Sequence, residues 1–454
     1  MIDTDTAIAR CADLIAEARK RGADAADAVT RAEASESVTV RLGELEEVER
    51  SEAESIGLRV FVGQRSASIQ TSDFSKAALE ELAERAVAMA RLAPEDSYAG
   101  LAPESRLFDG DGIAASAALD LVDRDEPTPQ ALREAALACE DAARAVEGVT
   151  NSNGGSAGAS RSVAALVTSH GFAQGYEASG HSLSASVVAG EGADKQTDYE
   201  YRTARHRTDL PTPDSIGAEA GRRTVARLKP GTMPSKAMPV VFDPRVGRSL
   251  IGHLIGAIGA PAVARKASFM IDRADDALFD RTYRILDDPS RRRGLRSRPF
   301  DGEGVAATPS ALVEDGKVTG WLTNVASARQ LDLDLTGHAS RGGGGSPGVS
   351  VSNVHLDAGE EAPSVEELIA DIEDGVLVTD VFGQGVNLIT GDYSRGAVGF
   401  RIRAGELAGP VAEFTIAGTL PEMFRALRAA DDLVFEQAID VPTLRIDTMT
   451  VAGE

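Results

Sequence analysis

Helical and alternating patterns of apolar residues follow one another twice in the first half of the chain. Residues 4–21 carry apolar side chains at helical spacing and end at Gly22, which predicts a first helix. Alternating segments at 38–42, 58–63 and 66–70 then indicate an antiparallel meander. A second helix is predicted over 75–92.

The same succession returns after residue 127. Thr128 and Pro129 are a cap and a first-turn proline, and they begin a predicted helix that runs to about Glu147. Further strands and a closing helix are predicted at 162–169, 181–189, 199–206 and 212–229. The order helix, meander, helix therefore occurs twice, which suggests a duplicated architecture.

From Ala237 onward the pattern changes to strands joined by longer loops. Hairpins are predicted at 310–322 and 397–416, a capping box at Ser364 and Glu367, and a closing strand at 444–453. We therefore expect an α+β fold with two helix–meander–helix units and a mainly antiparallel, β-rich C-terminal domain. The expected divisions are 1–95, a linker or wrapping loop at 96–127, 128–230, and 235–454.

The stretch from Asp243 to Met270 organises this last domain. Asp243 and Pro244 form a helix start, and the following residues place one apolar arc toward a core: Val246, Leu250, Ile251, Leu254, Ile255 and Ile258. The opposite side carries Ser249, Gly252, Gly256 and Gly259. Each glycine costs a helix about 1 kcal/mol, so we expect something to approach this backbone closely.

His253 lies at the border of the two faces, where a metallopeptidase helix would hold two histidines and a glutamate. In this chain Ser249 and Ala257 lie one turn before and one turn after His253, and Leu254 follows His253 directly. No two of the six histidines lie within five residues of each other. We therefore predict no metal ligand and no catalytic residue in this chain. His253 is either bonded to backbone or water, or it takes part in a cleft or subunit contact.

The segment 383–396 combines a mobile backbone with concentrated polar chemistry. Four glycines accompany Asp392, Tyr393, Ser394 and Arg395, a combination that suits an extended peptide. The alternative is a tight structural turn with an Asp–Arg pair. The candidate peptide- or interface-lining residues are His253, Gly252, Gly256, Gly385, Asp392, Tyr393, Ser394 and Arg395. The glycine-rich run 341–348 is expected to be a flexible loop or a flap.

Charge and cysteine content limit the classes of binding partner and the cellular compartments that we expect for this chain. The chain has 454 residues and a formal net charge of −24, which disfavours nucleic acid and anionic membranes. Its two cysteines, Cys11 and Cys139, show no metal or redox spacing, and the N-terminus lacks the pattern of a signal peptide. We expect a cytoplasmic protein.

Several motifs together resemble the TldD/PmbA metallopeptidase family, specifically its PmbA (TldE) branch. They are GHLIGAIGAPAVARKASF (252–269), FDGEGVAATPS (300–310), WLTNVASARQLDLDLTGHAS (321–340), GQGVNLITGDYSRGAVGF (383–400) and PVAEFTIAGTLPEM (410–423). The resemblance implies a heterodimeric peptidase acting on unfolded or small peptides. Its TldD-type subunit carries zinc on a His-Glu-x-x-x-His helix, whereas the PmbA-type subunit lacks the ligands and completes the cavity.

Three hypotheses follow from the residues and the resemblance. The favoured one is a metal-free subunit that pairs with a TldD-type partner, holds peptide and is not catalytic alone. Whether the isolated chain forms a homodimer is left open by the sequence. The second is a self-sufficient metallohydrolase assembled from distant residues such as His253, His338 and Asp392. The third is a peptide-binding scaffold without a hydrolytic partner.

Overall fold

The two N-terminal units contribute to one six-stranded antiparallel sheet. The structure is a computed structural model that describes residues 1–453, and of Ala193 only the backbone. Glu454, the last residue of the expected C-terminal domain, lies outside the described residues. The strand order is β3-β2-β1-β4-β5-β6, so β1 and β4 join the two units at the centre of the sheet.

Each unit has the predicted order of elements. The first comprises α1 (Thr4–Lys20), β1 (Ala25–Arg41), β2 (Glu44–Val62), β3 (Arg65–Thr71) and α2 (Lys76–Leu92). The second comprises α4 (Pro129–Arg144), β4 (Val149–Thr168), β5 (Ala173–Ala189), β6 (Gln196–Ala204) and α5 (Pro213–Ala226). Between them lie a 3₁₀ turn (Glu104–Arg106) and α3 (Gly112–Ala118).

The strands are much longer than the sequence pattern predicted. The segment expected at 38–42 is only the end of β1, which has 17 residues and pairs with β2 and β4 along its length. Its middle part is rich in Ala, Ser and Glu, which favour strands weakly. Pairing on both sides, rather than local preference, therefore extends these strands.

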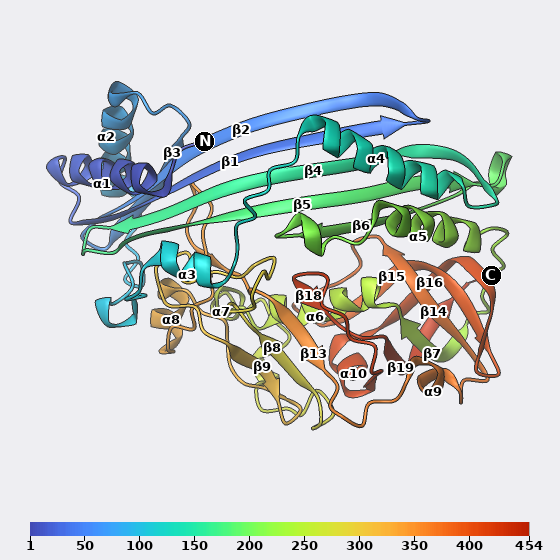
Figure 1. Cartoon of the computed structure of the whole chain (residues 1–454). Coiled ribbons are helices and arrows are strands. Elements are labelled where there is room, and N and C mark those ends of the chain that lie inside the picture. The colour runs from blue at the N-terminus through green and yellow to red at the C-terminus, as the bar shows by residue number, and fades with distance from the viewer. Residues whose placement is uncertain (454) are drawn as a thin grey trace.

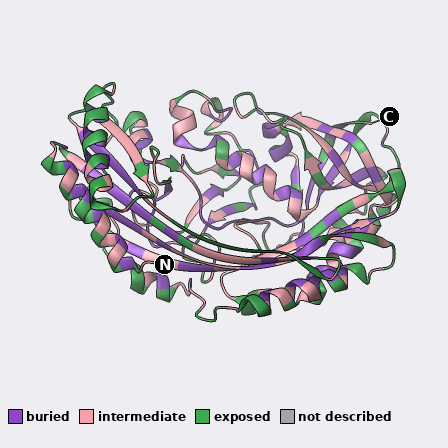
Figure 2. Cartoon of the chain, turned by 90° about the horizontal axis from the view of Figure 1, so that it is seen from above, coloured by how far each residue is buried: buried purple, intermediate pink, exposed green. Residues whose placement is uncertain are grey.

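The helices pack on one face of this sheet and leave the other to the C-terminal domain. Apolar side chains of α1 and α2 form one core with β1 and β2, and those of α4 and α5 form a second core with β1, β4 and β5. Figure 2 shows the strands as a curved layer with helices along the convex side and the C-terminal domain within the curve.

The C-terminal domain begins with β7 (Lys236–Phe242), α6 (Pro244–Ala257) and α7 (Ala260–Ala264). One of its sheets has the order β16-β15-β14-β7-β19-β17, and β16 also pairs with β19, so five strands close into a small barrel. The bounds are β14 (Asp374–Phe382), β15 (Asp392–Arg403), β16 (Glu406–Thr419), β17 (Leu427–Ala429) and β19 (Leu444–Ala452).

A second sheet has the order β10-β9-β8-β13-β18. Its strands are β8 (Arg284–Asp287), β9 (Ser310–Glu314), β10 (Lys317–Val318), β13 (Val354–Asp357) and β18 (Ile439–Asp440). The remaining α-helices and strands of this domain are α8 (Val325–Leu331), β11 (Ala339–Ser340), β12 (Gly348–Val349), α9 (Val365–Ile369) and α10 (Leu420–Arg425). The expected α+β class is confirmed, with a β-rich C-terminal region.

A buried charge cluster fastens the C-terminal domain to the first unit. Arg59 of β2 donates to Asp27 of β1 (Nε to Oδ2, 2.9 Å) and lies 3.3 Å from Glu303 of the C-terminal domain. Arg341, the first residue of the glycine-rich run 341–348, also pairs with Asp27. All four side chains are buried. The glycine-rich run is therefore anchored at its start.

Candidate functional site

The predicted helix start is present, and α6 turns its apolar arc into the core of the C-terminal domain. The Asp243 side chain accepts a hydrogen bond from the Arg245 backbone N–H (2.8 Å), and Pro244 occupies the first turn. The arc residues Val246, Leu250, Ile251, Leu254 and Ile258 are buried, and Ile255 packs against them. In Figure 1 the helix lies between the long sheet and the barrel.

The glycine side of α6 is open along most of its length. Gly252 has no heavy atom within 4 Å of the position that a Cβ would take, and Gly256 would meet only Leu388 Cδ1, at 3.0 Å. Gly259 differs from expectation, because the helix ends at Ala257 and Gly259 is a buried residue ahead of α7. The open side of the helix therefore presents Gly252 and Gly256.

His253 contacts the buried ring of Tyr393 on β15. The ring centroids are 6.1 Å apart at an interplanar angle of 69°. His253 Nε2 and the Tyr393 hydroxyl are both buried, and neither has a hydrogen-bond partner among the described residues. Burial lowers the pKa of His253, and the nearby charge of Arg395 lowers it further. Burial also raises the pKa of Tyr393 to about 12. Both side chains are thus neutral near pH 7.

The segment 383–396 forms a turn that leads into the start of β15. The Gly385 carbonyl accepts the Ser394 N–H at 2.6 Å, and a Cβ on Gly385 would come within 1.9 Å of the Ser394 carbonyl oxygen. Arg395 donates to the Phe382 carbonyl (3.2 Å). Asp392 accepts a hydrogen bond from the Thr390 hydroxyl (2.6 Å) and forms no ion pair with Arg395, so the turn lacks the Asp–Arg pair of the alternative hypothesis.

The structure therefore brings together only some of the candidate residues. His253, Tyr393 and Arg395 are neighbours beside the open glycine positions of α6. Asp392 and Ser394 are exposed and alternate with Tyr393 and Arg395 along β15, so they face the other side of the strand. Gly385 supports the turn through its backbone.

These residues do not fit a zinc ion. A catalytic zinc site needs three protein ligands and a position for water. One turn from His253 stand Ala257 and Ser249, whose hydroxyl donates to the Val246 carbonyl (2.7 Å). Within residues 1–453, no three His, Cys, Asp or Glu side chains are grouped so that they could hold a metal ion.

A cluster that sequence spacing did not indicate links three distant polar residues of the C-terminal domain. His338 Nε2 lies 3.0 Å from Asp287, which also binds the Ser352 hydroxyl and backbone N–H. In a hydrolase triad the histidine stands between serine and carboxylate. Here the carboxylate is central, so the cluster ties loops together and supplies no nucleophile.

A cavity of about 340 Å³ adjoins the start of α6 and is lined by Tyr201 and Arg248, among others. The Arg248 guanidinium lies 3.3 Å from the Tyr201 hydroxyl, and Arg245 stacks over Tyr199 at 4.7 Å. These arginines and tyrosines were not among the predicted site residues, because β6 and α6 are more than forty positions apart.

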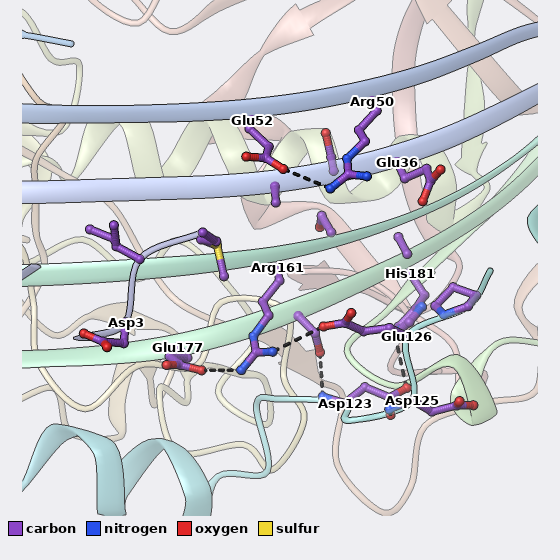
Figure 3. A pocket seen from close by; sticks show the side chains of 18 residues that line it. Asp3, Glu36, Arg50, Glu52, Asp123, Asp125, Glu126, Arg161, Glu177 and His181 are labelled. Atoms are coloured by element: carbon purple, nitrogen blue, oxygen red, sulfur yellow. Dashed lines mark hydrogen bonds and ion pairs between the residues drawn. The ribbon is translucent and has the colours of Figure 1, made fainter. Parts of the chain in front are cut away.

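A second cavity of about 510 Å³ lies on the helix-bearing face of the sheet (Figure 3). Several of its charges are paired: Arg161 with Glu177 (2.8 Å) and Glu126 (3.2 Å), and Arg50 with Glu52 (3.0 Å). His181 Nε2 lies 3.1 Å from Asp123, and burial lowers the pKa of this histidine. None of the predicted site residues lines it. It is a polar gap between the two helix layers.

Family models match nearly the whole chain. The PmbA/TldA metallopeptidase domain 1 matches residues 26–90, the central domain 123–228, and the C-terminal domain 235–453. The Escherichia coli O157:H7 metalloprotease PmbA is 36% identical over 92% of this chain and 90% of its own. A Haemophilus influenzae PmbA homologue is 36% identical over 96% of this chain and 94% of its own.

Solved structures have the same fold. A Bacteroides thetaiotaomicron protein titled as a candidate modulator of DNA gyrase superposes with a TM-score of 0.90 at 24% identity, covering 100% of both chains. TldE from Thermococcus kodakarensis superposes with a TM-score of 0.84 at 20% identity, covering 98% of this chain and 100% of its own. At such identities these two establish the fold alone.

The fold and the matched domains define a PmbA/TldD-type protein. This chain belongs to the PmbA/TldD metallopeptidase family and, within it, to the PmbA (TldE) branch. No helix in the described part of the chain combines the length and apolar character needed to cross a bilayer.

Proposed function

We propose that this chain is the metal-free subunit of a cytoplasmic two-subunit zinc peptidase that acts on unfolded or small peptides. The zinc and the catalytic glutamate belong to a TldD-type partner. This subunit closes the cavity and holds substrate, and its own residues move no proton.

One observation carries the proposal: the helix α6 of a metallopeptidase family member presents a lone histidine beside Tyr393 and two accessible glycines, without the ligands that zinc requires. A polypeptide or partner backbone can approach the glycine positions closely. His253 Nε2 and the Tyr393 hydroxyl are buried beside these glycines without a hydrogen-bond partner among the described residues, and a water molecule could satisfy them.

Reconstitution tests the proposal. The purified chain is assayed for zinc content and for cleavage of an unfolded peptide, alone and after mixing with a TldD-type subunit. We expect no stoichiometric zinc and no cleavage by this chain alone, and cleavage by the mixture that exceeds that of the partner alone. Chelator-sensitive cleavage by this chain alone, or partner activity unchanged on mixing, would contradict the proposal.

A further inference from the structure

The largest sheet has a long free edge. Residues 56–62 of β2 pair with β3, whereas residues 44–55 pair only with β1 and meet no strand on their other side within the described chain. Residues 44–53 are all exposed. Figure 1 shows β2 along the border of the sheet that lies farthest from the C-terminal domain. An unpaired row of backbone N–H and C=O groups is a template for another strand.

Short strands, bulges and covering loops usually protect sheet edges. This edge runs for twelve residues without a covering element, and the register shift in its pairing with β1 lies close to the turn, opposite Thr39 and Val40. Three apolar side chains at the β1–β2 turn and in the first residues of this edge are about half exposed: Leu42 at 50%, Leu45 at 46% and Val48 at 51%. An apolar patch adjoining an open strand is typical of a surface that a partner covers.

The negative charge of this edge indicates which kind of strand could pair with it. Residues 44–55 contain six glutamates and one arginine. Two identical copies paired edge to edge would bring two such strands together, and like charges on adjoining strands are destabilising. A strand carrying Lys or Arg would instead gain cross-strand ion pairs. The edge therefore disfavours a second copy of this chain and favours a homologous subunit of complementary charge.

We propose that residues 44–55 are the pairing strand of this subunit, and that they add a basic edge strand of the homologous catalytic subunit to the sheet. This inference rests on the proposed function, since it names the surface through which the two subunits meet. One sheet would then run continuously through the pair, with the apolar patch at the β1–β2 turn covered by the partner.

Hydrogen exchange tests the contact directly. Amide exchange across 44–55 is measured in this chain alone and in its mixture with the TldD-type subunit. We expect at least ten-fold slower exchange of the outward-facing amides in the mixture, with little change on α2. Protection of this strand in the chain alone would mean self-pairing and would overturn the inference.

Charge reversal tests the selectivity. E47K/E49K reverses two exposed glutamates of the edge, and E81K/E84K makes the same charge change at exposed positions of α2. We expect the edge variant to raise the Kd for the partner at least ten-fold and the α2 variant to leave it within two-fold. Added salt should weaken the wild-type pair, since exposed charges are screened.

The outcomes separate the two proposals. If the wild-type chain binds and activates the partner while both double variants behave alike and the edge amides exchange as in the free chain, the edge inference fails and the proposed function stands. If the wild-type chain neither binds nor activates the partner, both fail. Exchange of β4 amides in each variant shows that the sheet remains folded.

Discussion

At the scale of single residues, the contact between His253 and Tyr393 leaves two buried polar atoms without partners. A buried polar group without a hydrogen bond costs about 1–3 kcal/mol. Natural cores rarely keep such a group unless water or a ligand satisfies it. This pair lies beside Gly252 and Gly256, the open glycine positions of α6. The free-energy cost of its two unpartnered atoms is therefore consistent with a role other than stabilising the fold.

Replacing Tyr393 by Phe tests this reasoning. Removal of an unpartnered hydroxyl should leave the free energy of unfolding unchanged or raise it by about 1 kcal/mol, as measured by urea titration. Tyr283→Phe is the matched control, because its hydroxyl accepts the Ala429 N–H at 3.0 Å, and its loss should cost about 1–3 kcal/mol. A comparable loss from Tyr393→Phe would show that its hydroxyl is bonded within the fold.

Asp374 provides a pH-dependent contribution at the rim of the barrel. Hydrogen bonds from Arg401 (2.9 Å) and Lys236 (2.7 Å) lower the pKa of this carboxyl to about 2. Since its folded pKa lies below its unfolded value, the carboxylate stabilises the fold above about pH 4. That contribution is lost as the pH falls toward 2.

The variant Asp374→Asn should therefore be less stable than wild type at pH 6, and the difference should shrink as the pH approaches 3. Urea midpoints of both proteins across this range measure it. The control is Asp13→Asn, an exposed carboxyl of α1 that makes no hydrogen bond or ion pair with the described residues. A difference between wild type and Asp374→Asn that stays constant with pH would contradict this reasoning.

At the scale of elements, α6 carries glycines that its own packing does not require. Gly252 faces open space, so Gly252→Ala should stabilise the isolated chain by about 0.5–1 kcal/mol through helix propensity. In the reconstituted peptidase the same methyl should lower activity, if a backbone comes close there. Thermal unfolding and peptide cleavage, measured on the same sample, separate the two effects.

Gly256→Ala is the companion variant. Its methyl would lie 3.0 Å from Leu388 Cδ1, so it crowds a neighbour of the same chain and should gain less stability than Gly252→Ala. Unchanged activity of Gly252→Ala in the reconstituted pair would mean that nothing approaches the helix at this point.

Local signals predicted the helices well because their caps and spacing are local. Thr128, Asp243 and Ser364 each cap a helix as expected. Strand length was underestimated, since the charged middle of β1 is extended by its neighbours. The tip of the β1–β2 hairpin shows why local signals are not enough. There Glu140 accepts hydrogen bonds from the backbone N–H groups of Leu42 (2.7 Å) and Gly43 (3.0 Å), which lie nearly one hundred positions away in the sequence.

The candidate site could be predicted only in part from the sequence, because it too depends on contacts between residues far apart in the chain. The wheel of α6 located His253 and the glycines, and composition located Tyr393 and Arg395. Which of these residues meet depends on β15 passing α6, a tertiary contact. The cluster of His338, Asp287 and Ser352 spans 51 and 65 positions, and no spacing motif indicates it.

At the scale of the whole molecule, four buried charges join the C-terminal domain to the first unit. Asp27 and Glu303 balance Arg59 and Arg341, and each of these side chains is no more than 7% exposed. Such a balanced set holds parts of a protein in one arrangement only while all its members are present, because a single removal leaves an unpaired charge in a dry site.

Arg341→Met should therefore lower the free energy of unfolding by about 3–5 kcal/mol, since the two carboxylates would share one guanidinium. Asp27→Asn in the same chain removes the excess charge and should recover part of that loss. Equilibrium urea unfolding of the single and double variants gives the coupling between the two residues. Arg428→Met is the control, because Arg428 is 44% exposed and lies 4.0 Å from Asp447, so it should cost less than about 1 kcal/mol. If Arg341→Met costs no more than this control, the glycine-rich run is not what fastens the C-terminal domain to the sheet, and the apolar contacts between the domains must suffice.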